Sequence, residues 1–165
     1  MGKKTSKSHK NPLMLFWLYA IINEMAIFLS TFVNSIDGKG RVVLPKEFRA
    51  VVENEFKGFV AFRSHKLDAV DGFSMQRMEK LSQKMEEDYD PFSAQRDSLE
   101  TAIFADAVTI RFDKDGRIVI PANLLEHAKI DDKVAFVGRG ATFQIWNPEL
   151  FAAHQKEARS KLHAG

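Results

Sequence analysis

The sequence predicts an α+β fold in which two pseudo-symmetric units pack into one small barrel-like β core with flanking helices. Two observations lead to this prediction. First, SIDGKGRVVLP at 35–45 is followed 76 positions later by a similar run, RFDKDGRIVIP, at 111–121. Second, each run continues into apolar residues at helical spacing and then into a β-rich stretch containing Val-Ala-Phe. Because a unit this short cannot bury its own apolar face, the two copies must pack together.

Composition supports a folded protein and excludes several classes of site. Of the 165 residues 45% are hydrophobic, and no cysteine is present, so disulfide and thiolate chemistry are absent. The five histidines are scattered, and none has the spacing of a metal ligand. The formal charge is +2, but 27–165 alone carry 20 basic and 21 acidic residues, a net charge of −1. A nucleic-acid site would therefore need local clustering of cations or multiplication by assembly.

Residues 1–26 are expected to be an extension outside the fold. They combine a lysine-rich start with ten mostly apolar residues at 13–22, whereas a membrane-spanning helix needs about 20. One interpretation is a secretory signal, although Glu24-Met25-Ala26 is a poor cleavage site. The favoured interpretation is an overlong start, with Met25 as the genuine first residue.

The first unit is expected to occupy 27–90. Its predicted elements are a strand at 27–33, a turn at 37–41, a strand at 41–44, a short helix with Pro45 at its first position and Gly58 at its end, a strand at 59–63 and a helix at 73–85. The last helix carries a stripe of Met75, Met78, Leu81 and Met85, which predicts core packing or a subunit contact.

A connecting helix at 91–106, using Phe92, Leu99, Ile103 and Phe104, is expected to join this unit to a second unit at 107–165. The second unit is predicted to repeat the order with a strand at 107–112, a turn at 113–117, a strand at 118–120, a helix opened by Pro121 and a hairpin of 134–137 with 142–146. Asn147-Pro148 is predicted to cap a final helix whose inner side carries Phe151, His154, Ala158 and Leu162.

The two turns have the chemistry of three-residue hairpin loops. Gly40 and Gly116 stand where such a loop needs a left-handed residue. Asp37 and Arg41, like Asp113 and Arg117, then become neighbours at the hairpin mouth. A hairpin closed by an exposed ion pair needs no further function, so this structural interpretation remains open.

The functional interpretation is that the hairpin tips present cations to DNA. Arginine suits bidentate contact with phosphate or guanine, and a two-stranded ribbon fits the major groove. The predicted DNA-binding residues are Lys39, Arg41, Lys46, Arg49, Lys114 and Arg117, with Arg111 at the entrance of the second hairpin. Asp37, Gly40, Asp113 and Gly116 are predicted to orient the hairpins.

Other site patterns do not fit. The 113–116 run lacks the glycine and glutamate positions of an EF-hand, and 38–41 lacks the longer phosphate-loop pattern. Ser64, His65 and either Asp68 or Asp71 suggest a catalytic triad, but an ordinary loop is the better interpretation. We therefore expect no enzyme activity, cofactor, metal, membrane attachment or small-molecule substrate.

Two Asp-x-x-x-Arg hairpins, the runs at 37–49 and 113–121, and the late Ile145-Trp146 together resemble the bacterial MraZ proteins over about 27–162. The resemblance implies a tandem of AbrB-like swapped-hairpin units. It also implies a cytoplasmic, nucleoid-associated transcriptional regulator of the division and cell-wall gene cluster, acting as a ring-like homo-oligomer on short promoter repeats. The DNA-contacting motif then falls on Asp37, Arg41, Asp113 and Arg117.

Two further expectations follow. Asp115 makes the second tip more acidic than the first, so the first hairpin is expected to contribute more to DNA binding. The alternative function is a protein-binding module of antitoxin-like type with secondary DNA binding, in which the Met-lined helix or the C-terminal helix grips a partner.

Overall fold

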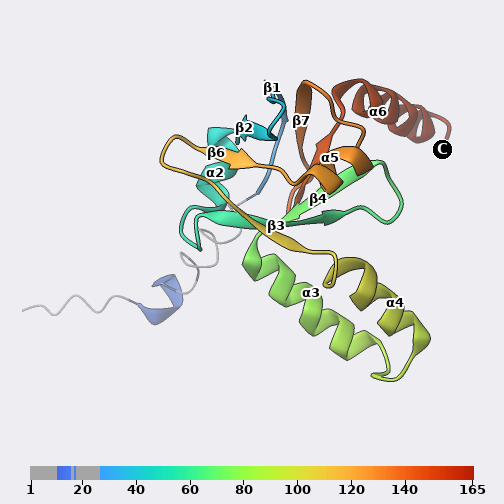
Figure 1. Cartoon of the computed structure of the whole chain (residues 1–165). Coiled ribbons are helices and arrows are strands. Elements are labelled where there is room, and N and C mark those ends of the chain that lie inside the picture. Colours follow the sequence, from blue (N-terminus) through green and yellow to red (C-terminus); the bar gives the residue numbers. More distant parts are fainter. Residues whose placement is uncertain (1–10, 16, 18–26) are drawn as a thin grey trace, which may run out of the picture.

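The computed structural model describes residues 11–15, 17 and 27–165 (Figure 1). Most of the predicted extension at 1–26 therefore lies outside the described residues. Within the described part, no helix combines the length and the apolar character needed to cross a membrane. In chain order the elements are β1 Thr31–Ser35, β2 Arg41–Val43, α2 Lys46–Val52, β3 Gly58–Arg63, β4 Ala69–Phe73, α3 Met75–Asp88, α4 Ala94–Ile103, β5 Val108–Arg111, β6 Arg117–Val119, α5 Ala122–His127, β7 Lys133–Gly138, β8 Phe143–Trp146 and α6 Pro148–His163.

The strands form one six-stranded sheet and one two-stranded ribbon, and the chain is α+β as predicted. The order of the large sheet is β1-β7-β8-β4-β3-β5, with every neighbouring pair antiparallel. The predicted barrel does not close, because β1 and β5 are the two edges of this sheet in the part of the chain that is described. β2 and β6 leave the sheet and pair with each other instead.

The two sequence copies exchange strands. β1 of the first copy pairs with β7 of the second, and β5 of the second copy pairs with β3 of the first. β4 and β8 meet at the centre, with Val70 opposite Ile145. The strand order is therefore symmetric about the β4–β8 pair, and neither copy completes its part of the sheet alone.

The β2–β6 ribbon lies on the same pseudo-two-fold axis. Val42 is opposite Ile118, and these two residues are equivalent in the repeat. Arg41 is opposite Val119, and Val43 is opposite Arg117. Just beyond the strands, the Leu44 amide donates to the Gly116 carbonyl at 2.9 Å, and the Ile120 amide donates to the Gly40 carbonyl at 2.8 Å. The repeated sequence thus builds a symmetric ribbon from its two Gly-Arg-x-Val segments.

Alternating strand residues divide the apolar interior between the two faces of the sheet. Phe59 and Ala61 of β3 face the main core, which also contains Val42 and Ile118 of the ribbon. Val60 and Phe62 point to the other face and contact α3 and α4, while Ala135, Val137 and Trp146 contact the start of α6. Burial on both faces explains why the repeated Val-Ala-Phe runs are continuously apolar. Figure 1 shows α3 and α4 side by side as a helical hairpin that extends from the sheet.

Several predicted boundaries require correction. β1 begins at Thr31 rather than at residue 27, although Phe28 forms an isolated bridge with Gly140. Pro45 and Pro121 are N-cap residues with extended ψ values of 135° and 144°, one position before the helical positions predicted for them. α2 ends at Val52, and Gly58 starts β3 instead of ending the helix.

The sequence predicts no strand at 69–73 and places residue 73 in the following helix, but the structure has strand β4 there. The run Ala69-Val-Asp-Gly-Phe73 has little apolar alternation, but Gly72 is required because a Cβ there would collide with the Phe143 ring. Helix α3 instead starts after Ser74, whose hydroxyl accepts from the Arg77 amide at 3.1 Å. The residues 69–73 therefore form a strand because they pair and pack with β8, and their own sequence does not predict it.

Two helices differ from prediction in what they cover. Helix α4 begins at Ala94, so Phe92 lies in the preceding turn, where it is 97% exposed. Helix α6 has the predicted Asn147 cap, but only its beginning contacts the sheet, and Leu162 is 82% exposed. The predicted inner stripe of α6 thus continues beyond the body of the protein.

Candidate nucleic-acid interface

The first hairpin turn is held by Asp37. Its Oδ1 accepts from the amides of Lys39 and Arg41, both at 2.9 Å, and its Oδ2 accepts from Arg41 Nε at 2.7 Å. Gly40 has a φ of +79°, the left-handed conformation predicted for it. A single carboxylate therefore closes the turn and also fixes the base of the Arg41 guanidinium.

The second turn repeats this arrangement. Asp113 Oδ1 accepts from the amides of Asp115 and Arg117 at 2.9 and 3.0 Å, and Oδ2 accepts from Arg117 Nε at 3.2 Å. Gly116 has a φ of +76°. These contacts and φ values give the two aspartates and two glycines a place in the geometry of the turns, and their role in orienting the hairpins toward DNA stays a prediction.

Hydrogen bonding to the charged form lowers the pKa of both aspartates. For Asp37 the largest cause is the Arg41 amide, followed by the Arg41 side chain. For Asp113 the largest cause is the Arg117 amide. Both carboxylates are therefore ionised at neutral pH, the form that the turn amides and guanidinium groups require.

The outward face of the ribbon carries two arginines and two valines. Val42 and Ile118 point into the core, which leaves Arg41, Val43, Arg117 and Val119 on the opposite face. The Arg41 and Arg117 side chains are 55% and 56% exposed. From the strand register, their Cα atoms lie about 8 Å apart on a diagonal. The arrangement is a narrow ribbon with a cation at two opposite corners.

The two arginines are not equivalent. Arg117 donates a further bond from Nη2 to Asp115 Oδ2 at 3.2 Å, whereas Arg41 bonds to Asp37 through Nε. In the part of the chain that is described, neither Nη of Arg41 has a hydrogen-bond partner. Asp115, which makes the second tip more acidic than the first, thus contacts the arginine of that tip directly.

The sequence position of Lys46 and Arg49 predicts that they lie beside the first hairpin, but the structure places them beside the second. They line a hollow of about 660 Å³ together with Lys57, Lys114 and Asp113 of the second hairpin. A Cβ on Gly116 would collide with the Arg49 guanidinium, so this group packs directly over the second turn. The reason is the strand exchange, which places α2 of the first copy beside the hairpin of the second. The second tip therefore gains cations that the sequence assigned to the first.

Two cations near the ribbon were missed or given little weight. Lys57 lines the hollow and has a φ of +55° at the end of the turn before β3. Arg111 stacks over the Phe56 ring at 5.4 Å and lines a second hollow of about 540 Å³ with Arg41 and Arg117. The sequence offered a signal only for Arg111, which immediately precedes the second turn.

The Met-lined helix is not free to grip a partner. Met78 and Met85 are buried against Val60 and Phe62 of β3, which confirms the prediction of core packing and removes one surface of the antitoxin-like alternative. His154 stacks on the Trp146 ring at 4.8 Å, so it packs against the body as expected.

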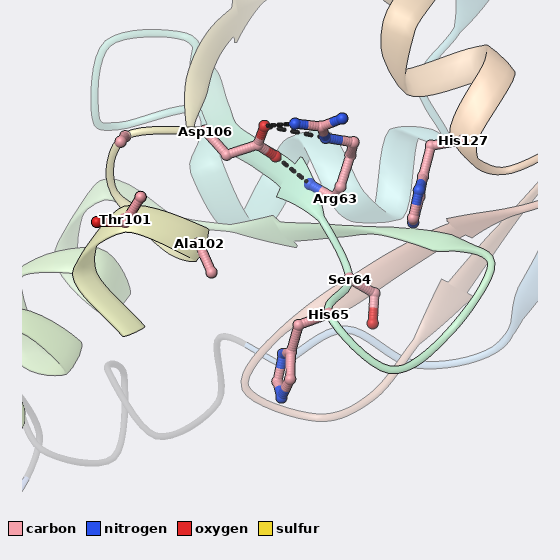
Figure 2. A pocket seen from close by; sticks show the side chains of 8 residues that line it. Arg63, Ser64, His65, Thr101, Ala102, Asp106 and His127 are labelled. Atoms are coloured by element: carbon pink, nitrogen blue, oxygen red, sulfur yellow. Dashed lines mark hydrogen bonds and ion pairs between the residues drawn. The ribbon is translucent and has the colours of Figure 1, made fainter. Parts of the chain in front are cut away.

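The Ser64–His65 region is an ordinary loop. It borders a hollow of about 410 Å³. Figure 2 shows an ion pair between two of the lining residues, in which Asp106 Oδ1 accepts from Arg63 Nη2 at 2.6 Å. The carboxylates considered for a triad bind elsewhere, Asp68 to Lys129 and Asp71 to Gln144. Among residues 11–15, 17 and 27–165, no group of three or more His, Cys, Asp or Glu is placed to hold a metal ion.

Comparison with known proteins gives consistent matches. A family model described as "MraZ protein, putative antitoxin-like" matches residues 103–164. A protein of Rickettsia akari (strain Hartford) named "Transcriptional regulator MraZ" is 42% identical over 140 residues, which cover 84% of this chain and 93% of that protein. A protein of the same name from Rickettsia bellii (strain OSU 85-389) is 44% identical over 141 residues, with the same two coverages. These alignments extend over most of both chains, so the similarity includes the first hairpin as well as the second.

Proposed function

Because this chain belongs to the MraZ family, whose members compared above are named transcriptional regulators, we propose that it regulates transcription by binding duplex DNA through the β2–β6 ribbon. The assignment to a regulator family also places the chain outside the enzymes. The observation that carries the proposal is the outward ribbon face, with Arg41 and Arg117 at opposite corners.

The proposal extends to finer properties that the sequence resemblance implies. Two AbrB-like swapped-hairpin units, 27–90 and 107–165, are joined through 91–106, and the exchange of β1 and β5 supports this interpretation. The protein acts as a ring-like homo-oligomer on short promoter repeats of the division and cell-wall gene cluster. Its place in the cell is the cytoplasm, at the nucleoid.

The ribbon has the dimensions of a major-groove reader. Two strands are about 5 Å apart, and the groove is about 12 Å wide. Arg41 and Arg117 then reach phosphate or guanine edges at two positions, while Val43 and Val119 between them can contact thymine methyl groups. Asp37 and Asp113 hold Nε of each arginine, which leaves both Nη groups of Arg41 for the duplex, whereas Nη2 of Arg117 must first leave Asp115. Four basic residues line the hollow beside the second tip: Lys46, Arg49, Lys57 and Lys114. They contact the phosphate backbone of the DNA next to the groove that the ribbon enters.

Assembly addresses the near-neutral charge of the described chain. Residues 27–165 have a net charge of −1, so a single ribbon supplies few phosphate contacts. Several ribbons on one face, each bound to one repeat, add their contacts and gain from effective concentration. Each phosphate neutralised adds about 0.9 to the slope of log affinity against log salt.

Fluorescence anisotropy with repeat-containing and scrambled duplexes tests the proposal. Arg41→Ala and Arg117→Ala should each weaken specific binding by about 1–3 kcal/mol, and Arg41 should contribute more because Asp115 engages Arg117. The control is Arg77→Ala, which removes an exposed arginine of α3 away from the ribbon. Unchanged binding by the double variant Arg41→Ala/Arg117→Ala, with the fold intact by circular dichroism, would refute the proposal.

A further inference from the structure

The tip of the α3–α4 hairpin presents an aromatic side chain to solvent. Phe92 is 97% exposed, although the turn that carries it is well defined. The Phe92 amide donates to Asp90 Oδ1 at 2.8 Å, and the Ser93 amide donates to the Asp90 carbonyl at 3.0 Å. Ser93 then caps α4 through a bond from the Arg96 amide at 3.2 Å. A fixed turn that holds a phenylalanine in water has the form of a preorganised anchor.

The surroundings of Phe92 restrict what can cover it. The run 86–92 contains four acidic residues, Glu86, Glu87, Asp88 and Asp90, and no basic residue. Lys84 pairs with Asp88 at 3.2 Å, and Arg96 lies near Glu86 and Asp90, so the tip keeps an excess of negative charge. This charge repels nucleic acid and anionic lipid. The matching surface must therefore combine an apolar contact with positive charge.

The exposed half of α6 is such a surface. Phe151, Ala158 and Leu162 lie along one side of the helix, because they are seven and four residues apart. Phe151 packs on Trp146 at 5.7 Å between ring centroids, but Leu162 is 82% exposed. Arg159 and Lys161 flank the free end of this stripe on its two sides. The net charge of 156–163 is +2, counting Lys156, Glu157, Arg159 and Lys161.

We propose that the Phe92 tip of one protomer docks on the Ala158–Leu162 stripe of a second copy of this chain. Figure 1 shows the α3–α4 hairpin and the end of α6 extending from different parts of the molecule, so the two surfaces can join successive protomers head to tail. Such a heterologous contact produces a closed ring when the rotation per protomer closes. The inference rests on the homo-oligomer in the proposed function and names the surfaces that form it.

A mixing experiment with two variants tests the head-to-tail contact. Phe92→Asp removes the anchor and leaves α6 intact, whereas Leu162→Asp removes the stripe and leaves the tip intact. Both side chains lie outside the core, so the variants should keep the wild-type circular dichroism spectrum. By native mass spectrometry the wild type should be oligomeric, and each variant alone should be a monomer, with self-association at least about 30-fold weaker.

An equimolar mixture of the two variants should form a heterodimer, because each supplies the surface that the other lacks. The control Gln83→Asp places a new acid on an exposed α3 position and should remain oligomeric. The inference is overturned if the wild type is monomeric, if either variant remains oligomeric, or if the mixture stays monomeric.

Charge complementarity has its own test. Glu86→Lys with Glu87→Lys should dissociate the oligomer, and adding Arg159→Glu with Lys161→Glu in the same chain should restore it. Failure of the restored chain to assemble would contradict the proposed pairing. The result is separable from the DNA proposal, since Phe92→Asp monomers should keep a weaker binding to duplex that is lost when Arg41 and Arg117 are also replaced by alanine.

Discussion

Gly40 and Gly116 occupy the same position in the two hairpins, so replacing each with alanine gives a matched pair of perturbations. Both residues have a left-handed φ, +79° and +76°, and alanine there costs about 1–2 kcal/mol. The difference lies in what the new methyl group meets. At Gly40 it meets the Ile120 carbonyl oxygen, and the Ile120 amide is bonded to the Gly40 carbonyl at 2.8 Å. At Gly116 it meets the Arg49 guanidinium, which is the end of a flexible side chain.

The stability effects should therefore differ. At Gly40 the ribbon backbone must shift, which adds about 1–3 kcal/mol and gives a total loss of about 2–5 kcal/mol. At Gly116 the guanidinium can move toward solvent, so the loss should stay near the conformational cost of about 1–2 kcal/mol. Displacement also releases Arg49 Nε, which is buried without a hydrogen-bond partner in the described chain. Gly116→Ala should thus be the milder change in stability.

Urea denaturation followed by circular dichroism measures this difference, provided that the m-values of the two variants match that of the wild type. The control is Gly38→Ala, since in the described part of the chain no atom beyond its immediate neighbours lies within 4 Å of the position that an alanine Cβ would take. Equal losses at Gly40 and Gly116, or a larger loss at Gly116, would refute the assignment of backbone contact to one turn and side-chain contact to the other.

Three carboxylates give further predictions. Asp115→Asn should tighten duplex binding about threefold at low salt, because it frees Arg117 and removes a negative charge. Such a charge at a separation of about 6 Å would repel a phosphate by about 0.7 kcal/mol in water, and the gain should shrink as salt screens this repulsion. Burial raises the pKa of Asp71, so the folded protein is less stable when this carboxyl is ionised. Asp71→Asn should therefore raise the melting temperature at neutral pH. It should not raise the melting temperature in acid, where the carboxyl is already protonated. The Arg63 side chain lowers the pKa of Asp106, so the unfolded chain takes up this proton first as the pH falls. Asp106→Asn should therefore lose less stability between neutral and acidic pH than the wild type does in the same melts.

The repeated hairpins could be predicted because their determinants are local. An Asp that accepts turn amides, a left-handed Gly and an Arg beside the Asp all lie within five consecutive positions, and the structure places them as expected. The cap of α6 is equally local, since Asn147 Oδ1 accepts from the Glu149 amide at 2.9 Å. Such features depend on neighbours in sequence, so pattern and spacing suffice to find them.

The features that were missed depend on distant partners. β4 contains Asp71 and Gly72, which oppose strand formation in isolation, but Gln144 Nε2 donates to Asp71 Oδ1 at 2.8 Å and the Phe143 ring covers Gly72. The location of Arg49 beside the second turn follows from strand exchange between copies, which no local pattern reveals. The sheet is open and not a closed barrel because β2 and β6, which are far apart in sequence, pair with each other outside the six-stranded sheet.

Site-directed crosslinking measures directly whether the outward face of the β2–β6 ribbon enters the DNA. The chain has no cysteine, so Val43→Cys and Val119→Cys each introduce a unique thiol on that face, and both valines are exposed. Each thiol is coupled to a short photoreactive group, with Gln83→Cys on α3 as the matched control. We expect crosslinks from residues 43 and 119 to bases of the bound repeat and none from residue 83. Bound duplex that crosslinks at residue 83 but not from the ribbon would contradict this expectation.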